Sequence, residues 1–178
     1  MNGHLLDVNV LIALADPQHI HHDAAHAWFG RHAADGWATC PITENAFIRI
    51  ASHPAYPNRP GDAQVVIDLL RRTCSREGHR FWPDTSSLRQ IVAPDHALTH
   101  GQVTDVYLLA LAVAHGGRLA TLDRGIPAGA VDGGREAAVL ADGLDFEQLA
   151  MAARHQQQQV GKGKVRIHEA RTESMSFE

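Results

Sequence analysis

Short apolar runs alternate with longer stretches of helical periodicity along most of this chain, and this alternation constrains the fold more than any other feature. A brief apolar run is typical of a buried strand, whereas apolar residues three and four positions apart indicate a helix. Strands that alternate with helices predict parallel βαβ units with right-handed crossovers. Four runs are predicted as strands of a short parallel α/β sheet, and the last of the following is a possible fifth: 4–7, 37–40, 80–83, 118–122 and 137–140.

Five stretches between these runs carry helical patterns. Thr43 and Thr104 stand just before two of them, and a threonine hydroxyl is a good helix cap. Gly116 and Gly117 follow the most apolar stretch, where glycine commonly ends a helix. The predicted helices are 8–15, 21–32, 44–52, 63–76 and 105–115.

Length and composition indicate one folded domain with a polar tail. A chain of 178 residues with 44% hydrophobic content can bury a substantial core. We expect a domain over residues 1–145 and a glutamine-rich, flexible tail over 146–178, which contains the run 156–159. No stretch approaches the roughly 20 apolar residues of a membrane helix, and the start of the chain lacks a signal-peptide pattern. These features predict a cytoplasmic protein without a membrane partner.

The lysines and cysteines exclude several kinds of chemistry. The only lysines are Lys162 and Lys164, so the predicted domain has none for P-loop phosphate binding or for a Schiff base. Residues 1–150 carry 11 Arg against 17 Asp and Glu, which argues against a broad basic surface for nucleic acid. Cys40 and Cys74 show no metal-type spacing and are predicted to be reduced and structural.

Four acidic residues occupy positions where a predicted strand ends or a helix begins. Asp7 and Asp123 end strands, Glu44 follows a strand shortly after its end, and Asp105 opens a helix. In open α/β sheets, sites form outside the carboxyl ends of the strands. Carboxylates brought together there repel one another unless a cation lies between them, and hard divalent cations prefer oxygen ligands. The pattern predicts a metal site suited to phosphodiester hydrolysis.

The phrases around these acids resemble the PIN domain, and most closely the VapC-type toxin ribonucleases of bacterial toxin–antitoxin pairs. The resemblance covers roughly residues 3–142. It implies a three-layer α/β/α sandwich and a metal-dependent endoribonuclease. The phrases that carry it are Asp7-Val8-Asn9, Thr43-Glu44-Asn45, Thr104-Asp105-Val106-Tyr107 and Thr121-Leu122-Asp123-Arg124.

Carried over to this sequence, the resemblance implies a site built from the four acids. We expect Asp7 and Asp105 to ligate Mg²⁺ or Mn²⁺, with Glu44 and Asp123 completing the site directly or through water. It also implies a homodimer, an RNA substrate and a small VapB-like antitoxin that covers the acidic pocket.

Other polar residues are expected around the acids. Asn9 and Thr121 would be polar neighbours of the acidic set. Arg124, Arg49 and Arg59 are candidate phosphate contacts, because the arginine fork donates paired hydrogen bonds to phosphate oxygens.

Several alternatives remain open from the sequence. A Mg²⁺-dependent phosphatase or receiver domain also places aspartates at strand ends, but these depend on a lysine near the acids. A structure-specific DNA nuclease of the PIN-like group is a further alternative, and so is a binding domain that has lost catalysis. His22 and His26 lie one helical turn apart, as zinc ligands can, although a solvated helix start is the interpretation we favour.

Overall fold

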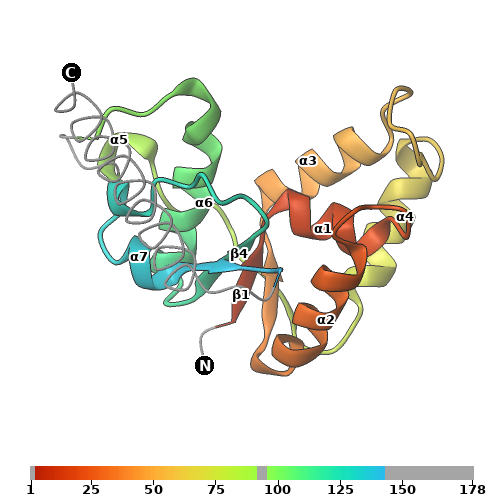
Figure 1. Cartoon of the computed structure of the whole chain (residues 1–178), viewed down its shortest axis with the longest axis horizontal. Helices are drawn as coiled ribbons and strands as arrows, with labels where there is room; N and C mark the ends of the chain where they lie inside the picture. Colours follow the sequence, from red (N-terminus) through yellow and green to blue (C-terminus); the bar gives the residue numbers. More distant parts are fainter. Residues whose placement is uncertain (1–2, 92–95, 143–178) are drawn as a thin grey trace, which may run out of the picture. The chain divides into compact units, whose positions relative to one another are not determined.

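The computed structural model describes residues 3–91 and 96–142, where five strands form one parallel sheet (Figure 1). The strand order is β3-β2-β1-β4-β5. The predicted parallel sheet is therefore confirmed, including its fifth strand. The strands are β1 (His4–Leu6), β2 (Trp37–Thr39), β3 (His79–Phe81), β4 (Arg118–Thr121) and β5 (Ala138–Leu140).

The central strand β1 pairs with β2 on one side and with β4 on the other. His4 is in register with Trp37 and with Arg118, and Leu6 is in register with Ala120. The ladder continues one residue past β1, because the Asp7 amide donates to the Ala120 carbonyl at 2.9 Å. All strands run in one direction, so the residues that follow β1, β2 and β4 emerge at the same edge of the sheet.

Helices cover both faces of the sheet and make the predicted three-layer sandwich. In Figure 1, α1 to α4 lie on one side of the strands and α5 to α7 lie on the other. Three short 3₁₀ helices complete the described elements: η1 (Ala33–Asp35), η2 (His100–Gln102) and η3 (Ala128–Ala130). The α-helices are α1 (Val8–Ala15), α2 (His22–His32), α3 (Pro41–Ala51), α4 (Ala63–Cys74), α5 (Leu88–Ile91), α6 (Val103–Ala114) and α7 (Gly134–Ala137).

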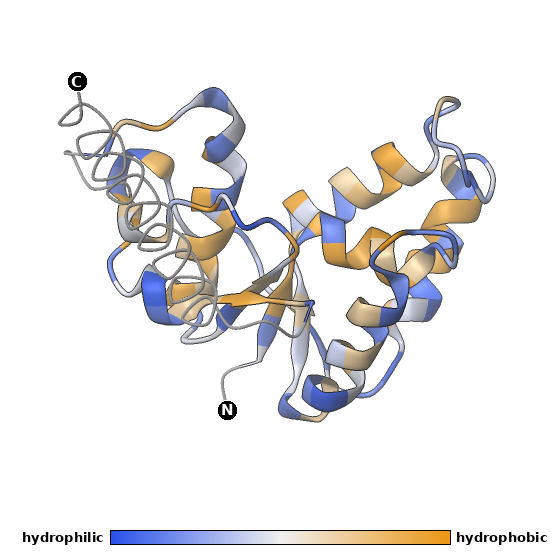
Figure 2. Cartoon of the chain, viewed as in Figure 1, coloured by the Kyte–Doolittle hydropathy of each residue, from blue (hydrophilic) through white to orange (hydrophobic). Residues whose placement is uncertain are grey.

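Side chains alternate between the two faces of each short strand. Leu6 and Ala120 belong to the core cluster that includes Trp28 and Phe47, on the side of α1 to α4. Strand geometry sends the neighbouring Leu5 to the opposite face, where α6 is buried from Val106 to Ala112. Figure 2 shows the apolar residues concentrated along α1, α6 and β5. This burial explains why the strands read as short apolar runs.

Two helices begin earlier than their threonines indicate, so the predicted caps are wrong. Proline is favoured in the first helical turn because its missing N–H needs no partner there, and α3 accordingly starts at Pro41 with Cys40 before it. Thr43 lies inside the helix, where its hydroxyl accepts from the Cys40 amide at 3.0 Å. The 3₁₀ turn η2 leads directly into α6, which puts Thr104 in the first turn of that helix.

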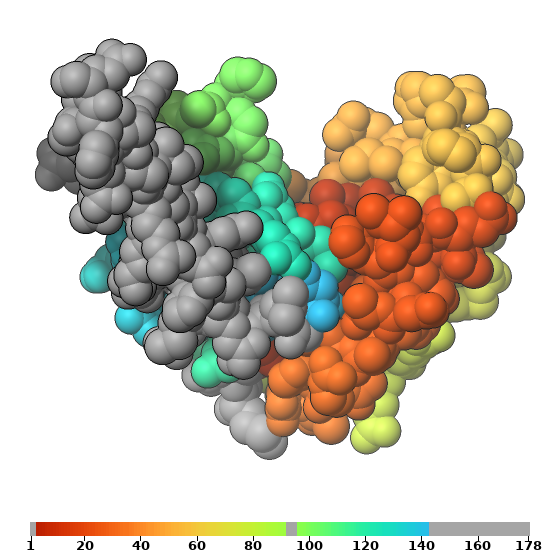
Figure 3. Space-filling model, viewed as in Figure 1, coloured from red at the N-terminus to blue at the C-terminus, as the bar shows by residue number. Residues whose placement is uncertain are grey.

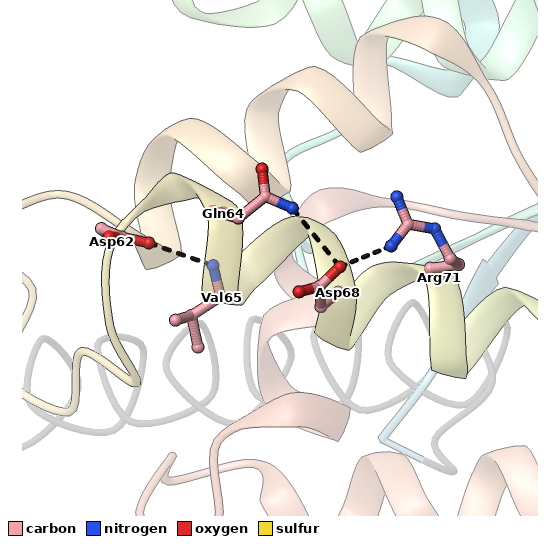
Figure 4. Close-up of polar contacts among 5 residues, drawn as sticks. All are labelled: Asp62, Gln64, Val65, Asp68 and Arg71. Carbon is pink, nitrogen blue, oxygen red and sulfur yellow. Dashed lines mark hydrogen bonds and ion pairs between the residues drawn. The ribbon is translucent and has the colours of Figure 1, made fainter.

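The helix α4 is held by polar contacts along its exposed side (Figure 4). Asp62 is its N-cap and accepts from the Val65 amide at 3.1 Å. One turn further, the Asp68 carboxylate accepts from Gln64 and pairs with Arg71. Such caps and spaced pairs support a helix from its solvent side. They leave the opposite face of α4, with Val66 and Leu70, buried in the core.

No helix among residues 3–91 and 96–142 is both long and apolar enough to cross a bilayer. The tail predicted over 146–178 lies outside the described residues, as does the end of the domain predicted over 1–145.

Candidate active site

Asp7 stands where β1 ends and α1 begins, and the residue is 4% exposed. As the N-cap of α1 it accepts from the Val8 amide through Oδ1 at 2.6 Å. Its other oxygen, Oδ2, accepts from Asn9 Nδ2 and from Thr121 Oγ1, both at 2.7 Å. A carboxylate has about four lone-pair directions, so three donors leave one for a further partner. Burial raises the pKa of Asp7 above its usual range, although these donors oppose the shift.

Asn9 and Thr121 tie the end of β1 to the end of β4. Asn9 Oδ1 accepts from the Leu122 amide at 3.0 Å, while its Nδ2 also donates to Thr121 Oγ1 at 3.1 Å. The Thr121 hydroxyl in turn accepts from the Asp123 amide at 3.0 Å. Every hydrogen-bonding direction of this buried hydroxyl is thereby used. The structure thus places both predicted polar neighbours against Asp7, as parts of the frame that holds it.

Asp123 lies in the tight turn after β4. Its Oδ1 accepts from the Gly125 amide at 2.7 Å, which closes the turn around the carboxylate. A carboxylate that bonds an amide two residues on forms an Asx turn. The contact through Thr121 brings the Asp123 backbone beside Asp7, from the neighbouring strand.

Asp105 approaches the same place from the first turn of α6. Burial, followed by the charges of Asp7 and Asp123, raises the pKa of Asp105 to about 6. Like charges raise the pKa of a carboxyl group only when they lie close to it. Three of the four predicted acids therefore form one group, which we call the aspartate cluster: Asp7, Asp105 and Asp123.

The fourth acid, Glu44, interacts with a different set of residues. It lies in the first turn of α3, and its Oε1 accepts from Thr39 Oγ1 at 2.7 Å. The same hydroxyl lies 2.9 Å from His79 Nε2. Burial and the charge of Glu44 raise the pKa of the Cys74 thiol, which places that thiol nearby. Glu44, Cys74 and His79 each present one ligand atom, and these atoms lie within 4.8 Å of one another.

Sequence reasoning missed the residues around Glu44. Cys74 ends α4 and His79 begins β3, and neither stands in a recognisable motif with Glu44. Their proximity follows from the pairing of β2 with β3 and from the packing of α3 on α4. A prediction that the strands at 37–40 and 80–83 are neighbours in the sheet would have brought Glu44 and His79 together.

The predicted phosphate-binding arginines differ in their surroundings. Arg124 pairs with Asp142 just beyond β5. The Arg59 side chain donates from Nε to the Gly61 carbonyl at 2.7 Å, within the proline-rich loop. Arg49 lies exposed near the end of α3. Only Arg124 is adjacent in sequence to a member of the aspartate cluster.

His22 and His26 serve as caps for α1. A ring nitrogen of His22 lies 2.8 Å from the Ala13 carbonyl, and one of His26 lies 3.0 Å from the Leu14 carbonyl. Carbonyls in the last turn of a helix lack partners within the helix, so these contacts satisfy the end of α1. The two histidines stand at the start of α2, as predicted, but their rings bond to carbonyls of α1, and only His26 is exposed.

The aspartate cluster has the chemistry of a site for a hard divalent cation. It offers oxygen donors only, and Asp7 retains one lone-pair direction among its donors. In Figure 3 the surface is hollowed between α6 (green) and α3 (light orange), with α1 (red) at the floor. A substrate entering this hollow would meet the edge of the sheet from which Asp7 and Asp123 emerge.

Comparison with known proteins identifies the family. A model of the PIN domain matches residues 4–131. Ribonuclease VapC44 of Mycobacterium tuberculosis is 47% identical over 131 residues, which cover 72% of this chain and 92% of that protein. Ribonuclease VapC39 of the same organism is 46% identical over 121 residues, or 67% and 87% of the two chains. Ribonuclease VapC38 of the same organism is 46% identical over 127 residues, which cover 68% of this chain and 86% of that protein. The chain therefore belongs to the PIN-domain family and, within it, to the VapC proteins.

Proposed function

We propose that this protein is an endoribonuclease that hydrolyses RNA phosphodiester bonds, and that it is the toxin of a toxin–antitoxin pair. The observation that carries the proposal is the aspartate cluster, where burial and the charges of Asp7 and Asp123 raise the pKa of Asp105 to about 6. Carboxyl groups with strongly raised pKa values concentrate at functional sites, and a bound cation would relieve the repulsion among these three aspartates. The relatives named Ribonuclease VapC support RNA as the substrate class.

The proposed cofactor is Mg²⁺ or Mn²⁺. Asp7 and Asp105 would be the principal ligands and Asp123 would complete the site, because all three offer hard oxygen donors. Glu44 keeps a place in the proposal through its second oxygen, Oε2, since Oε1 accepts from Thr39. When bound, such an ion supplies charge stabilisation at the phosphate and lowers the pKa of bound water.

The surrounding residues would fix the ligands before the ion binds. Thr121 and Asn9 hold one oxygen of Asp7, and the Val8 amide holds the other. A carboxylate held in this way loses little rotamer freedom on binding a cation, which favours affinity. The Gly125 amide does the same for Asp123 from within its own turn.

Substrate and partners are parts of the same proposal. With an acidic domain, RNA affinity must come from a few arginines and from the bound cation. Arg124 would release Asp142 and contact a phosphate beside the cluster, while Arg49 and Arg59 would contact phosphates further along the strand. We also propose a VapB-like antitoxin, a homodimer and a cytoplasmic location.

The test is cleavage of total bacterial RNA by purified protein with Mg²⁺, with Mn²⁺ and with chelator. Asp105→Asn should abolish cleavage, while Asp132→Asn, an exposed turn carboxylate outside the cluster, should retain it. A single-stranded and a duplex DNA substrate are included. Cleavage of DNA alone, or cleavage that survives chelation, would refute the proposal.

A further inference from the structure

The group around Glu44 brings together three kinds of metal-binding atom from three elements. Glu44 comes from α3, Cys74 is the last residue of α4, and His79 is the first residue of β3. One carboxylate oxygen, one thiol sulfur and one imidazole nitrogen lie within 4.8 Å of one another. All three side chains are partly buried, so each has access to solvent.

The mixture of donors selects among cations. Sulfur and imidazole nitrogen are poor ligands for Mg²⁺, whereas Zn²⁺ takes sulfur, nitrogen and carboxylate oxygen together. Bond lengths of about 2.0–2.3 Å place tetrahedral zinc ligands about 3.3–3.8 Å apart. The three atoms lie within 4.8 Å of one another, so the widest separation exceeds this range by about 1–1.5 Å, which rotation of the side chains would close.

A buried hydroxyl, that of Thr39, lies between the side chains of Glu44 and His79. Thr39 is fully buried, and its hydroxyl donates to Glu44 Oε1 at 2.7 Å and lies 2.9 Å from His79 Nε2. A hydroxyl has a single hydrogen to donate, and Thr39 donates it to Glu44 Oε1. A bound cation would supply the partner that the Cys74 sulfur needs once its thiol is deprotonated. The connection from Cys74 to His79 is short and turns at Gly78, which has a φ of +84°.

We propose that Glu44, Cys74 and His79 form a zinc site, with three protein ligands and a fourth position open to solvent. This goes beyond the proposed RNA cleavage, because it assigns a second metal of different chemistry to residues outside the aspartate cluster. Binding deprotonates the Cys74 thiol and releases that proton to solvent. Zinc sites with three protein ligands and one open position are well established in other proteins.

The test uses the full chain, reduced and freed of metal, with Co²⁺ as the spectroscopic substitute for Zn²⁺. One equivalent of Co²⁺ should produce the near-ultraviolet charge-transfer band of a cobalt–thiolate bond, and Zn²⁺ should abolish it. Excess Mg²⁺ should leave the band unchanged. Absence of the band in the wild-type protein would overturn the proposal.

Variants identify which residues carry the band. Cys74→Ser should eliminate it, whereas Cys40→Ser should retain it, because Cys40 is buried against Thr43. His79→Gln should weaken Co²⁺ binding by roughly 10-fold or more. Replacing both His22 and His26 with Gln should have no effect. A band that persists in Cys74→Ser, or is lost with His22 and His26, would overturn the assignment. Circular dichroism of each variant confirms that the fold is retained.

Zinc at this site would also regulate RNA cleavage, and this part rests on the proposed function. The zinc-bound carboxylate of Glu44 would be withdrawn from the magnesium site. In the cleavage assay, each protein is compared with its own rate without zinc. Low Zn²⁺ should inhibit the wild type about 10-fold more strongly than Cys74→Ser. Equal inhibition would overturn the regulatory part, while the cobalt spectrum reports on the site independently.

Discussion

Replacing Asp105 with asparagine is expected to stabilise the metal-free protein while it abolishes metal binding. The pKa of this carboxyl rises from 3.8 to about 6 on folding, which corresponds to about 3 kcal/mol of unfavourable ionisation. Because Asp105 is only partly buried, solvent screening reduces the figure to about 1–2 kcal/mol. An acidic side chain in the first turn of α6 also stabilises the helix by about 0.3–1 kcal/mol. The net gain for Asp105→Asn is therefore about 1 kcal/mol at pH 8.

The sign of the pH dependence follows from the direction of the shift. A carboxyl whose pKa is raised in the folded state destabilises the fold only when it is ionised. The advantage of Asp105→Asn should thus be full above pH 6 and should shrink as the pH falls toward 3.8. Thermal unfolding in chelator should show a midpoint higher by about 2–4 °C at pH 8 and little difference at pH 4.

Magnesium should reverse this order. Ligand at about 100 times its dissociation constant adds about 2.7 kcal/mol to the stability of a protein that binds it, so the wild type should become the more stable of the two. Asp132→Asn removes one charge outside the cluster and serves as the matched control. A variant no more stable than the wild type at pH 8, or equally stabilised at pH 4, would refute the raised pKa of Asp105.

Three further outcomes follow from the described contacts. Thr121→Val removes a donor to Asp7 and the acceptor of the Asp123 amide, so it should cost about 1–3 kcal/mol in chemical denaturation and lower cleavage, while Thr121→Ser retains both. Burial lowers the pKa of His4 to about 4, so wild-type stability should fall as the pH drops from 6.5 toward 4, and His4→Leu should remove this slope. Phe47→Ala should cost about 3–5 kcal/mol in the same denaturation assay, because Phe47 is 2% exposed in the core.

The strands and the aspartate cluster could be predicted from the sequence because their signals are local. The strands β1, β2 and β4 are short and mostly buried runs, and Asp7 and Asp123 stand just after β1 and β4. Parallel topology then brings Asp7 and Asp123 to one edge without any further information. The contact of Asp105 with that edge follows from its position at the start of a helix that packs against β1 and β4.

The surroundings of Glu44 could not be predicted because they depend on packing between distant elements. The start of α3 is fixed by Pro41 and not by Thr43, which turns Glu44 toward Thr39. The nearness of Cys74 depends on where α4 ends, two residues before the end of the predicted helix. No periodicity or motif encodes such a register, since it results from the fit of α3 and α4 against β2 and β3.

Glu44→Gln tests whether Glu44 belongs electrostatically to the aspartate cluster. The charges that raise the pKa of Asp105 are those of Asp7 and Asp123, and the glutamine amide oxygen can still accept from Thr39 Oγ1. The free energy of unfolding in chelator at pH 8 should therefore change by less than about 0.5 kcal/mol, although RNA cleavage should be lost. Stabilisation equal to that of Asp105→Asn would contradict this view, because it would show that the charge of Glu44 repels the same cluster. The two substitutions thus separate an acid that is strained by its neighbours from one that is held by hydrogen bonds.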